Sequence, residues 1–255
     1  MKAIELFAGV GGFRIGLERA GHEVVFANEW DKYACDTYDK NFGGSIDRRD
    51  LTTIPATDIP AHDIIVGGFP CQAFSIAGTR KGMDEARGTL FFEVLRIAKH
   101  HQTPYLLLEN VKGLLNHDGG RTFEVILRAL DELGYDCQWQ LLNSKYVTGQ
   151  NRERTYVVAH RRTSPRPLVF PITNQDLYAY RPDRHTADRG WSFTNGTRRL
   201  EPVEAERLQG FAEDWTEGVS YSQRMSQMGN AVTVNIVEAV ADRLPLILET
   251  AAPLV

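Results

Sequence analysis

The sequence has few cysteines and no long apolar run, and both absences narrow what the protein can be. Three of its 255 residues are cysteine, an odd number without the spacing of a metal site: Cys35, Cys71 and Cys137. Reduced thiols in a cytosolic compartment are the simplest interpretation. No hydrophobic segment is long enough to span a bilayer, and we expect neither a signal peptide nor a membrane partner. The sequence therefore predicts a cytoplasmic protein without a bound metal.

A strong excess of positive charge is also missing, since the formal net charge is -4. This average argues mildly against nucleic acid as a ligand. The charge is unevenly distributed, however: residues 145–207 hold 12 Lys and Arg against 7 Asp and Glu, and the rest holds 17 against 26. A basic patch on an acidic body steers a polyanion toward one face. A solvated basic surface without a partner explains the same count equally well.

What the sequence does contain, in its first half, is an alternation of short apolar runs and amphipathic segments. This pattern predicts strands at 2–7, 22–28, 63–69, 104–109, 136–146 and 153–160. It predicts helices at 12–20, 31–41, 89–100, 121–133, 201–209 and 231–248. Repeated strand–helix units indicate the α/β class, with a Rossmann-like, doubly wound and mostly parallel sheet.

The second half differs, because residues 162–200 are rich in Arg, Pro, Thr, Asn and Gly and have few apolar runs. We interpret this stretch as part of a small, loop-rich second domain. The predicted division is a catalytic and cofactor domain at 1–160, completed by a C-terminal helix at 229–250, and a small domain at 161–228.

Cys71 carries the strongest chemical signal. It follows the apolar run Ile64–Val66 and then Gly-Gly-Phe-Pro, which ends the strand. The thiol is therefore expected just beyond the carboxyl end of a buried strand, where open α/β sheets bind ligands. A thiolate there can act as a nucleophile. A lone cysteine is more often a small buried hydrophobe, but this turn favours the nucleophile.

Glycines at the first strand–helix turn indicate a nucleotide-like ligand. Gly9, Gly11 and Gly12 precede a helix, and Glu29 ends the next strand 20 residues after Gly9. Such glycines let the backbone approach a ligand closely, and the acid suits ribose hydroxyls. A tight turn without a ligand is the alternative. Trp30, next along the chain, is equally suited to stacking on adenine and to the core.

Three more charged residues are expected at the same sheet edge. Glu109 ends the strand at 104–109 and donates a hydrogen bond as an acid or accepts one as a carboxylate. Arg152 and Arg154 alternate along a strand, so their side chains share a face and suit a phosphate or a base carbonyl. The alternatives are a helix cap for the acid and a solvated edge for the arginines.

Together these segments resemble the DNA (cytosine-5)-methyltransferase family, of the bacterial or phage type, over most of the chain and in the family's order. Glu5 stands where many members have Asp. The segments that carry the resemblance are 5–13, 28–31, 50–51, 70–72 (Pro-Cys-Gln), 87–92, 109–111, 150–154, 199–202, 206–211 and 229–232.

The resemblance implies S-adenosylmethionine as the cofactor. Phe7 and Trp30 would flank its adenine, Glu29 would bind its ribose, and Asp50 would meet the adenine amino group. The other implied pocket residues are Ala8, Gly9, Gly11, Gly12, Pro70, Leu90, Asn230 and Val232.

The resemblance also implies double-stranded DNA as the substrate and a covalent mechanism. The Cys71 thiolate would add to C6 of a flipped cytosine, and protonated Glu109 would donate to N3. Arg152 would bind the base O2, and Arg154 would hold the cysteine loop or Glu109. The methyl group would go to C5. Residues 71–88 would form a mobile lid whose charged residues grip phosphates.

The stretch between the family's last strand and its conserved C-terminal motifs is short here, about 40 residues from 158 to 198. We therefore expect a short or degenerate target site, or a helper protein. Arginines outnumber amide side chains in this stretch, which predicts mainly phosphate contacts from Arg161, Arg162, Arg166, Arg181, Arg184 and Arg189.

We expect a monomer, with a cognate restriction enzyme as a candidate partner. Two alternative functions remain open. One is an RNA cytosine-C5 methyltransferase of the same fold, although the Cys-Phe-Thr signature of its tRNA-acting relatives is absent. The other is a non-catalytic nucleic-acid-binding subunit.

Overall fold

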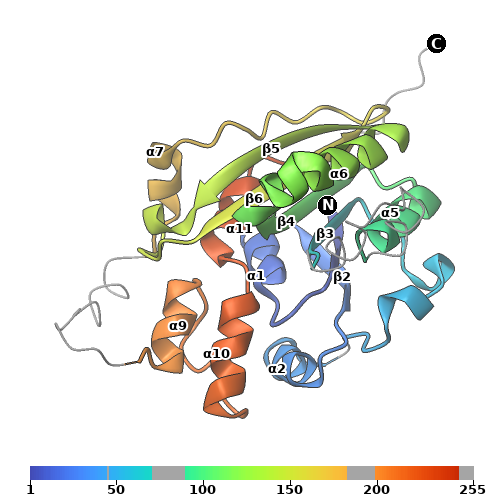
Figure 1. Ribbon diagram of the computed structural model, residues 1–255. Coiled ribbons are helices and arrows are strands. Elements are labelled where there is room, and N and C mark those ends of the chain that lie inside the picture. The colour runs from blue at the N-terminus through green and yellow to red at the C-terminus, as the bar shows by residue number, and fades with distance from the viewer. Residues whose placement is uncertain (45, 71–89, 183–198, 247–255) are drawn as a thin grey trace.

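The computed structural model describes residues 1–44, 46–70, 90–182 and 199–246, which build an α/β architecture around one six-stranded sheet (Figure 1). The strands run in the order β2-β1-β3-β4-β6-β5. Their bounds are β1 Lys2–Leu6, β2 Glu23–Asn28, β3 Ile64–Gly68, β4 Tyr105–Val111, β5 Tyr135–Asn143 and β6 Glu153–Arg161.

The sheet is mostly parallel, as predicted. Strands β2, β1, β3 and β4 pair in parallel, whereas β6 runs antiparallel to both β4 and β5. Strand β1 lies between β2 and β3, so the chain leaves β1 toward one side and later returns to the other. The carboxyl ends of β1 and β3 therefore meet at a switch point, where doubly wound sheets bind ligands.

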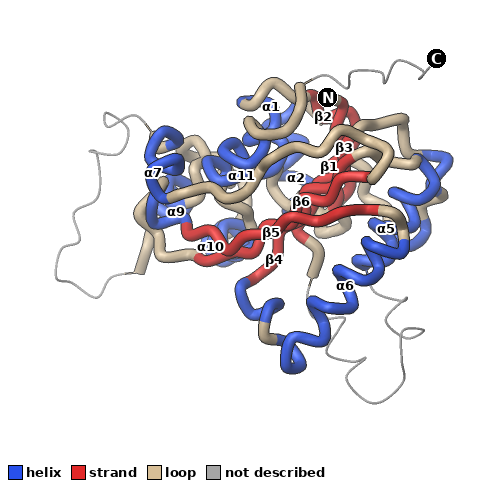
Figure 2. The backbone as a smooth tube through the Cα atoms, turned by 90° about the horizontal axis from the view of Figure 1, so that it is seen from above, coloured by secondary structure: helices blue, strands red, loops and turns tan. Residues whose placement is uncertain are grey.

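Apolar residues alternate along the central strands and fill a core on each face. Ile64 and Val66 of β3 pack in one cluster with α1 and α11, while Ile65 packs in the other with α5 and α6. Figure 2 shows these helix pairs on opposite sides of the sheet. Burial on both faces explains why these strands read as continuous apolar runs.

The helices mostly lie where the periodicity predicts them. Their bounds are α1 Gly12–Arg19, α2 Lys32–Phe42, α5 Leu90–His101, α6 Arg121–Glu132, α7 Asn174–Leu177, α9 Pro202–Leu208, α10 Tyr221–Asn230 and α11 Val234–Ala241. Short 3-10 turns lie at η1 Leu51–Thr53, η2 Ala56–Asp58, η3 Lys112–Leu115, η4 His117–Gly120, η5 Ser144–Tyr146 and η6 Tyr178–Tyr180. No helix within these described ranges is long and apolar enough to cross a membrane.

Three helical segments differ from the prediction. The short helix α7 lies in a stretch that was expected to be loop. Helix α10 was also not expected: most of its residues are polar, its apolar residues are Tyr221, Met225 and Met228, and its N-cap Ser220 accepts from the backbone of Gln223. The helix expected over 231–248 is shorter, and α11 ends at Ala241. Pro245 follows, and proline disfavours helical conformation in the residue before it.

The C-terminal helix lies against the first one. Gly16 of α1 has no room for a side chain, because an added Cβ would lie 2.6 Å from Val237 Cγ1 of α11. Val169, Ile172 and Leu177 are buried in the same cluster as α11. The first part of the segment 161–228 thus packs on the main sheet. The division at residue 161 stays a prediction.

Candidate active site

The turn after β1 has the backbone geometry of a ligand-binding loop. Gly9 and Gly11 have φ of 54° and 85°, and Phe7 has φ of 55°, which is rare for a residue with a side chain. A Cβ on Gly11 would lie 2.2 Å from the Phe42 ring. At Gly9, by contrast, no atom of the described residues lies within 4 Å of an added Cβ. The glycines therefore allow a tight turn whose Gly9 side faces open space.

Glu29 ties the end of β2 to this turn. Its carboxylate accepts hydrogen bonds from the backbone of Gly9 at 2.9 Å, Trp30 at 2.9 Å and Asp31 at 2.8 Å. Trp30 is 73% exposed. A core role for Trp30, one of the two interpretations left open by the sequence, is thus excluded.

Asp50 lies near the end of β2, in a segment that hydrogen bonds hold beside that strand. Asn28 Nδ2 donates to the carbonyls of Asp47 and Arg49, which holds the segment before Asp50 beside β2. Asp50 itself is exposed and caps the next turn by accepting from the backbone of Thr52.

Val232 and Asn230 bring the C-terminal motif to the glycine turn. A Cβ on Gly12 would lie 2.7 Å from Val232 Cγ2. Asn230 is exposed and ends α10.

The remaining residues expected in the cofactor pocket lie on three other elements. Leu90 begins α5, and exposed Pro70 follows β3. Ala8 is buried.

Glu109 is a buried carboxyl at the carboxyl end of β4. It pairs with Gly68 of β3 in the sheet register, and a Cβ on Gly68 would lie 3.0 Å from its Oε2. Burial raises the pKa of Glu109 to about 7, although Arg154 and Arg152 lower it. The side chain is therefore protonated in a substantial fraction of molecules near neutral pH. The helix-cap alternative fails, since this carboxyl is paired with an arginine.

Arg154 and Arg152 both lie near Glu109 but make different contacts. Arg154 Nε is 3.1 Å from Glu109 Oε1. Arg152 Nη2 donates to the carbonyls of Gly229 at 3.0 Å and Ala231 at 2.7 Å, while its buried Nε has no hydrogen-bond partner among the residues that the structure describes. The solvated-edge interpretation is wrong for both residues. In this conformation Arg154 holds the acid and Arg152 holds the turn around Asn230.

The segment that leads to Cys71 is fastened beside Glu109. Asn110 Nδ2 donates to the Phe69 carbonyl at 2.7 Å, and the Phe69 ring lies 5.3 Å from that of Phe91. The sequence offered the Glu-Asn-Val motif but no role for its asparagine. Cys71 lies outside the described residues, as does the predicted lid at 71–88.

Four polar side chains without a role assigned from the sequence connect two of the motifs, 150–154 and 206–211, with the start of α11. Gln209 Nε2 donates to Gln150 Oε1 at 2.6 Å, and Gln209 Oε1 accepts from Thr233 Oγ1 at 2.8 Å. The Thr233 hydroxyl also contacts Ser144 Oγ at 2.7 Å. Buried polar groups cost stability unless paired, so this chain of bonds fixes the relative positions of α9, α11 and the start of β6.

Arg161 and Arg162 lie away from the active site, at the other end of β6 from Arg154, and the phosphate contacts expected of Arg161, Arg162 and Arg166 stay a prediction. Arg161 ends β6, seven residues after Arg154, which at about 3.3 Å per residue separates them by roughly 23 Å. Arg162 is paired with Asp131 and Asp136. Arg184 and Arg189, by contrast, lie outside the described residues.

Comparison with known proteins agrees with this geometry. The family model for C-5 cytosine-specific DNA methylase matches residues 1–189 and 172–245. This chain belongs to that family. The type II methyltransferase M.HhaI of Haemophilus parahaemolyticus is 34% identical, with 94% of this chain and 93% of that protein aligned. M.NgoBI of Neisseria gonorrhoeae is 37% identical over 93% of this chain and 91% of that protein.

As a C-5 cytosine-specific DNA methylase, the protein is a methyltransferase that modifies C5 of cytosine in DNA, which implies S-adenosylmethionine as methyl donor. Among solved structures, Schizosaccharomyces pombe Dnmt2 methyltransferase matches with a TM-score of 0.71 at 17% identity, over 95% of this chain and 97% of that one. That likeness concerns the fold.

The methylase is shorter than its relatives within the aligned region. The alignment with M.HhaI is 305 residues long and this chain has 255, so at least 50 aligned positions have no counterpart here. The family model matches in two pieces that overlap at residues 172–189. Both facts agree with a reduced stretch between residues 158 and 198.

Proposed function

We propose that this methylase adds a methyl group to C5 of a flipped cytosine in double-stranded DNA through Cys71, with Glu109 as the acid at N3. The observation that carries the proposal is the Glu109–Arg154 pair: a buried carboxyl with a pKa near 7, beside the segment that ends in Cys71. A proton on this carboxyl is what the base needs when charge accumulates at N3.

The residues around the glycine turn fit S-adenosylmethionine. The described part of the chain leaves space where a side chain of Gly9 would be, and the Gly9 N–H already donates to the Glu29 carboxylate. Glu29 would replace its hydrogen bonds from backbone N–H groups with hydrogen bonds from the ribose hydroxyls. Exposed Trp30 and half-buried Phe7 would flank the adenine, and Asp50 would meet its amino group. The rest of the pocket would comprise Ala8, Gly11, Gly12, Pro70, Leu90, Asn230 and Val232.

The chemistry assigns each catalytic side chain one task. The Cys71 thiolate forms a bond to C6 while Glu109 protonates N3, and C5 becomes nucleophilic. S-adenosylmethionine, when bound, supplies the methyl group that C5 accepts. Loss of the C5 proton and then of the thiolate, with return of the N3 proton to Glu109, restores the aromatic ring. Arg152 binds O2 of the base, and Arg154 keeps Glu109 oriented and limits the rise of its pKa.

We further propose a monomeric, cytoplasmic enzyme that recognises a short or degenerate site, with its small recognition region at 161–228. The relatives named above are type II methyltransferases, which supports a cognate restriction enzyme as a partner.

A tritium-transfer assay tests the proposal. Purified protein with labelled S-adenosylmethionine should label double-stranded DNA and not tRNA, and Cys71→Ser should abolish the transfer while calorimetry still detects cofactor binding. Cys35→Ser is the matched control, because the Cys35 thiol donates to the Glu29 carbonyl and burial raises its pKa to about 12. Wild-type turnover by Cys71→Ser would rule out the covalent mechanism.

A further inference from the structure

Two cations and two tyrosines form a cluster outside the catalytic site. Lys145 Nζ lies 4.8 Å from the centroid of the Tyr146 ring, and the Arg181 guanidinium lies 4.1 Å from that of Tyr178. The two rings are 6.2 Å apart, edge to face. Arg181 Nε also donates to the Tyr146 carbonyl at 2.9 Å. These contacts join the segment after β5 to the segment after α7, and we call the four residues the ledge.

The ledge lies at the catalytic end of the β5–β6 pair. Asn143, the last residue of β5, pairs with Glu153 at the start of β6. Asn143 Oδ1 accepts from the backbone of both Lys145 at 3.0 Å and Arg152 at 3.2 Å. One asparagine thus fixes the ledge lysine next to the arginine that we assign to the base.

The two ledge cations are exposed and have no acidic partner among the described residues. Most other described arginines do: Arg162, for example, is paired with Asp131 and Asp136. An unpaired cation held over an aromatic face keeps its charge for an outside ligand, and the ring restricts its motion. Tyr178 is 41% exposed, so the rings are also open to contact.

We propose that the ledge of Lys145, Tyr146, Tyr178 and Arg181 binds the sugar-phosphate backbone of the DNA that flanks the flipped cytosine. This inference rests on the proposed function. Backbone phosphates need exposed cations at fixed positions, and such contacts set register without reading sequence. Arg181 uses Nε for the Tyr146 carbonyl, while its terminal nitrogens have no acceptor among the described residues and suit a phosphate. Phosphate contacts from the ledge would therefore add to the affinity for DNA of a protein with a small recognition region.

The test is the salt dependence of DNA binding by Lys145→Gln/Arg181→Gln. Each lost phosphate contact should reduce the slope of log affinity against log salt by about 0.9. Between 50 and 200 mM salt, the DNA affinity of the double variant should therefore fall roughly tenfold less than that of the wild type. This difference should be the same for duplexes of any sequence. Calorimetric affinity for S-adenosylmethionine and the melting temperature should stay at wild-type values.

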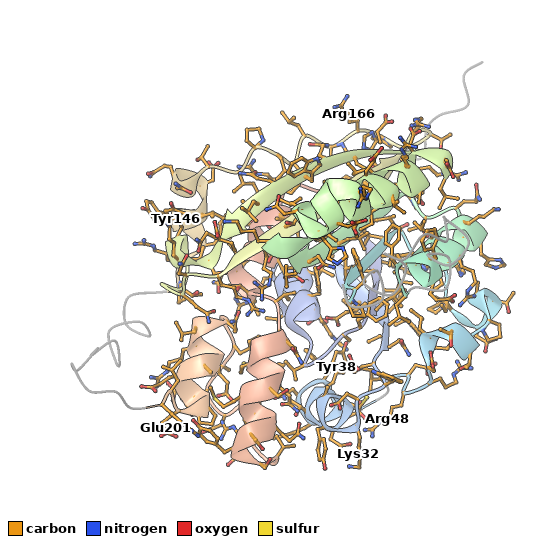
Figure 3. All side chains as sticks on the ribbon, viewed as in Figure 1. Lys32, Tyr38, Arg48, Tyr146, Arg166 and Glu201 are labelled. Atoms are coloured by element: carbon orange, nitrogen blue, oxygen red, sulfur yellow. The ribbon has the colours of Figure 1, made fainter. Side chains whose placement is uncertain are left out.

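Arg161→Gln/Arg166→Gln is the matched control, because it removes the same charge at the other end of β6. Figure 3 shows Arg166 far from Tyr146 across the β5–β6 pair. Its salt slope should equal that of wild type. An unchanged slope in the ledge variant, or an equal change in the control, would overturn the ledge. Failure of the wild type to bind or methylate DNA would instead overturn the proposed function itself.

Discussion

Arg152 donates from Nη2 to the carbonyl of Ala231 at 2.7 Å, and to that of Gly229 at 3.0 Å. These carbonyls flank Asn230, which we assign to the cofactor pocket, and Val232 lies over Gly12. The arginine that we assign to the base thus also holds one wall of the pocket for S-adenosylmethionine. Binding of the cytosine and binding of S-adenosylmethionine would both depend on Arg152, so a substitution of Arg152 should also change the affinity for the cofactor.

We expect Arg152→Ala to weaken S-adenosylmethionine binding even without DNA. Hydrogen bonds from a charged group contribute about 1.5–3 kcal/mol, so their loss frees the 229–231 turn and should reduce cofactor affinity roughly tenfold or more. Calorimetry on the protein alone measures this. Arg154→Ala is the control, because Arg154 contacts Glu109 and not the turn. Equal cofactor affinities in all three proteins would show that Arg152 does not support the pocket.

The activity should fall as pH rises through about 7, because Glu109 then loses its proton. Glu109→Gln has no proton to lose, so its kcat/KM should lack this alkaline limb while dropping by about 100-fold or more. Arg154→Gln should move the limb to higher pH, since Arg154 lowers the pKa of Glu109. A pH–rate profile of each variant decides the matter. A wild-type limb retained in Glu109→Gln would assign the titration to another group.

Glu5 makes a separate prediction about stability. It is fully buried at the start of the glycine turn, where its carboxyl accepts from the Tyr38 hydroxyl at 3.1 Å and the Arg14 backbone at 3.2 Å. Burial raises its pKa from 4.5 to about 8. Between these values the folded state holds a proton that the unfolded state has lost, so the free energy of unfolding falls as pH rises, by up to about 1.4 kcal/mol per pH unit.

Glu5 dominates this effect between pH 7 and 8. Glu109, whose pKa is raised to about 7, contributes a smaller part there, and His62, with its pKa lowered to about 4, gives a pH dependence only below its ordinary value. Glu5→Gln should therefore remove most of the decline in unfolding free energy between pH 7 and 8, measured by urea denaturation. Exposed Glu23→Gln should retain it. An undiminished decline in Glu5→Gln would contradict a neutral Glu5 in the folded protein.

Much of the site follows from where strands end. Parallel strands bring their carboxyl ends to one edge, so the sequence predicts that Glu109 lies near the residues that follow β3, as observed. Arg154 reaches the same edge from the start of β6 because β6 runs antiparallel to β4, and the contact of Arg154 with Glu109 was implied only by the family resemblance. Arg161 and Arg162, by contrast, lie at the opposite end of β6 from Arg154, because each residue moves about 3.3 Å along the strand. The number of charged residues in a segment does not show in which direction its strand runs in the sheet.

Contacts to backbone carbonyls were equally beyond prediction. The bond from Arg152 to Ala231 joins residues 79 apart, and its acceptor is a group that every residue has. Helix α10, which presents Gly229, is mostly polar, and its few apolar residues did not lead us to predict it. Hydrophobic periodicity predicts the core and the strand ends, whereas polar long-range contacts depend on the folded chain.

The short recognition region leads to the last prediction, that target discrimination is weak. At least 50 positions of the M.HhaI alignment have no counterpart in this chain. Arg162, which follows the far end of β6, forms ion pairs with two aspartates. The amide side chains left to read base edges are few: Asn174, Gln175 and Asn195. Each good bidentate contact contributes about 1–3 kcal/mol of discrimination, so few readers favour a site that is short or tolerates several bases. Bisulfite sequencing of DNA from an expressing host should reveal such a site. One strictly defined site of about six or more base pairs, methylated by the purified monomer, would show that chain length here does not limit recognition.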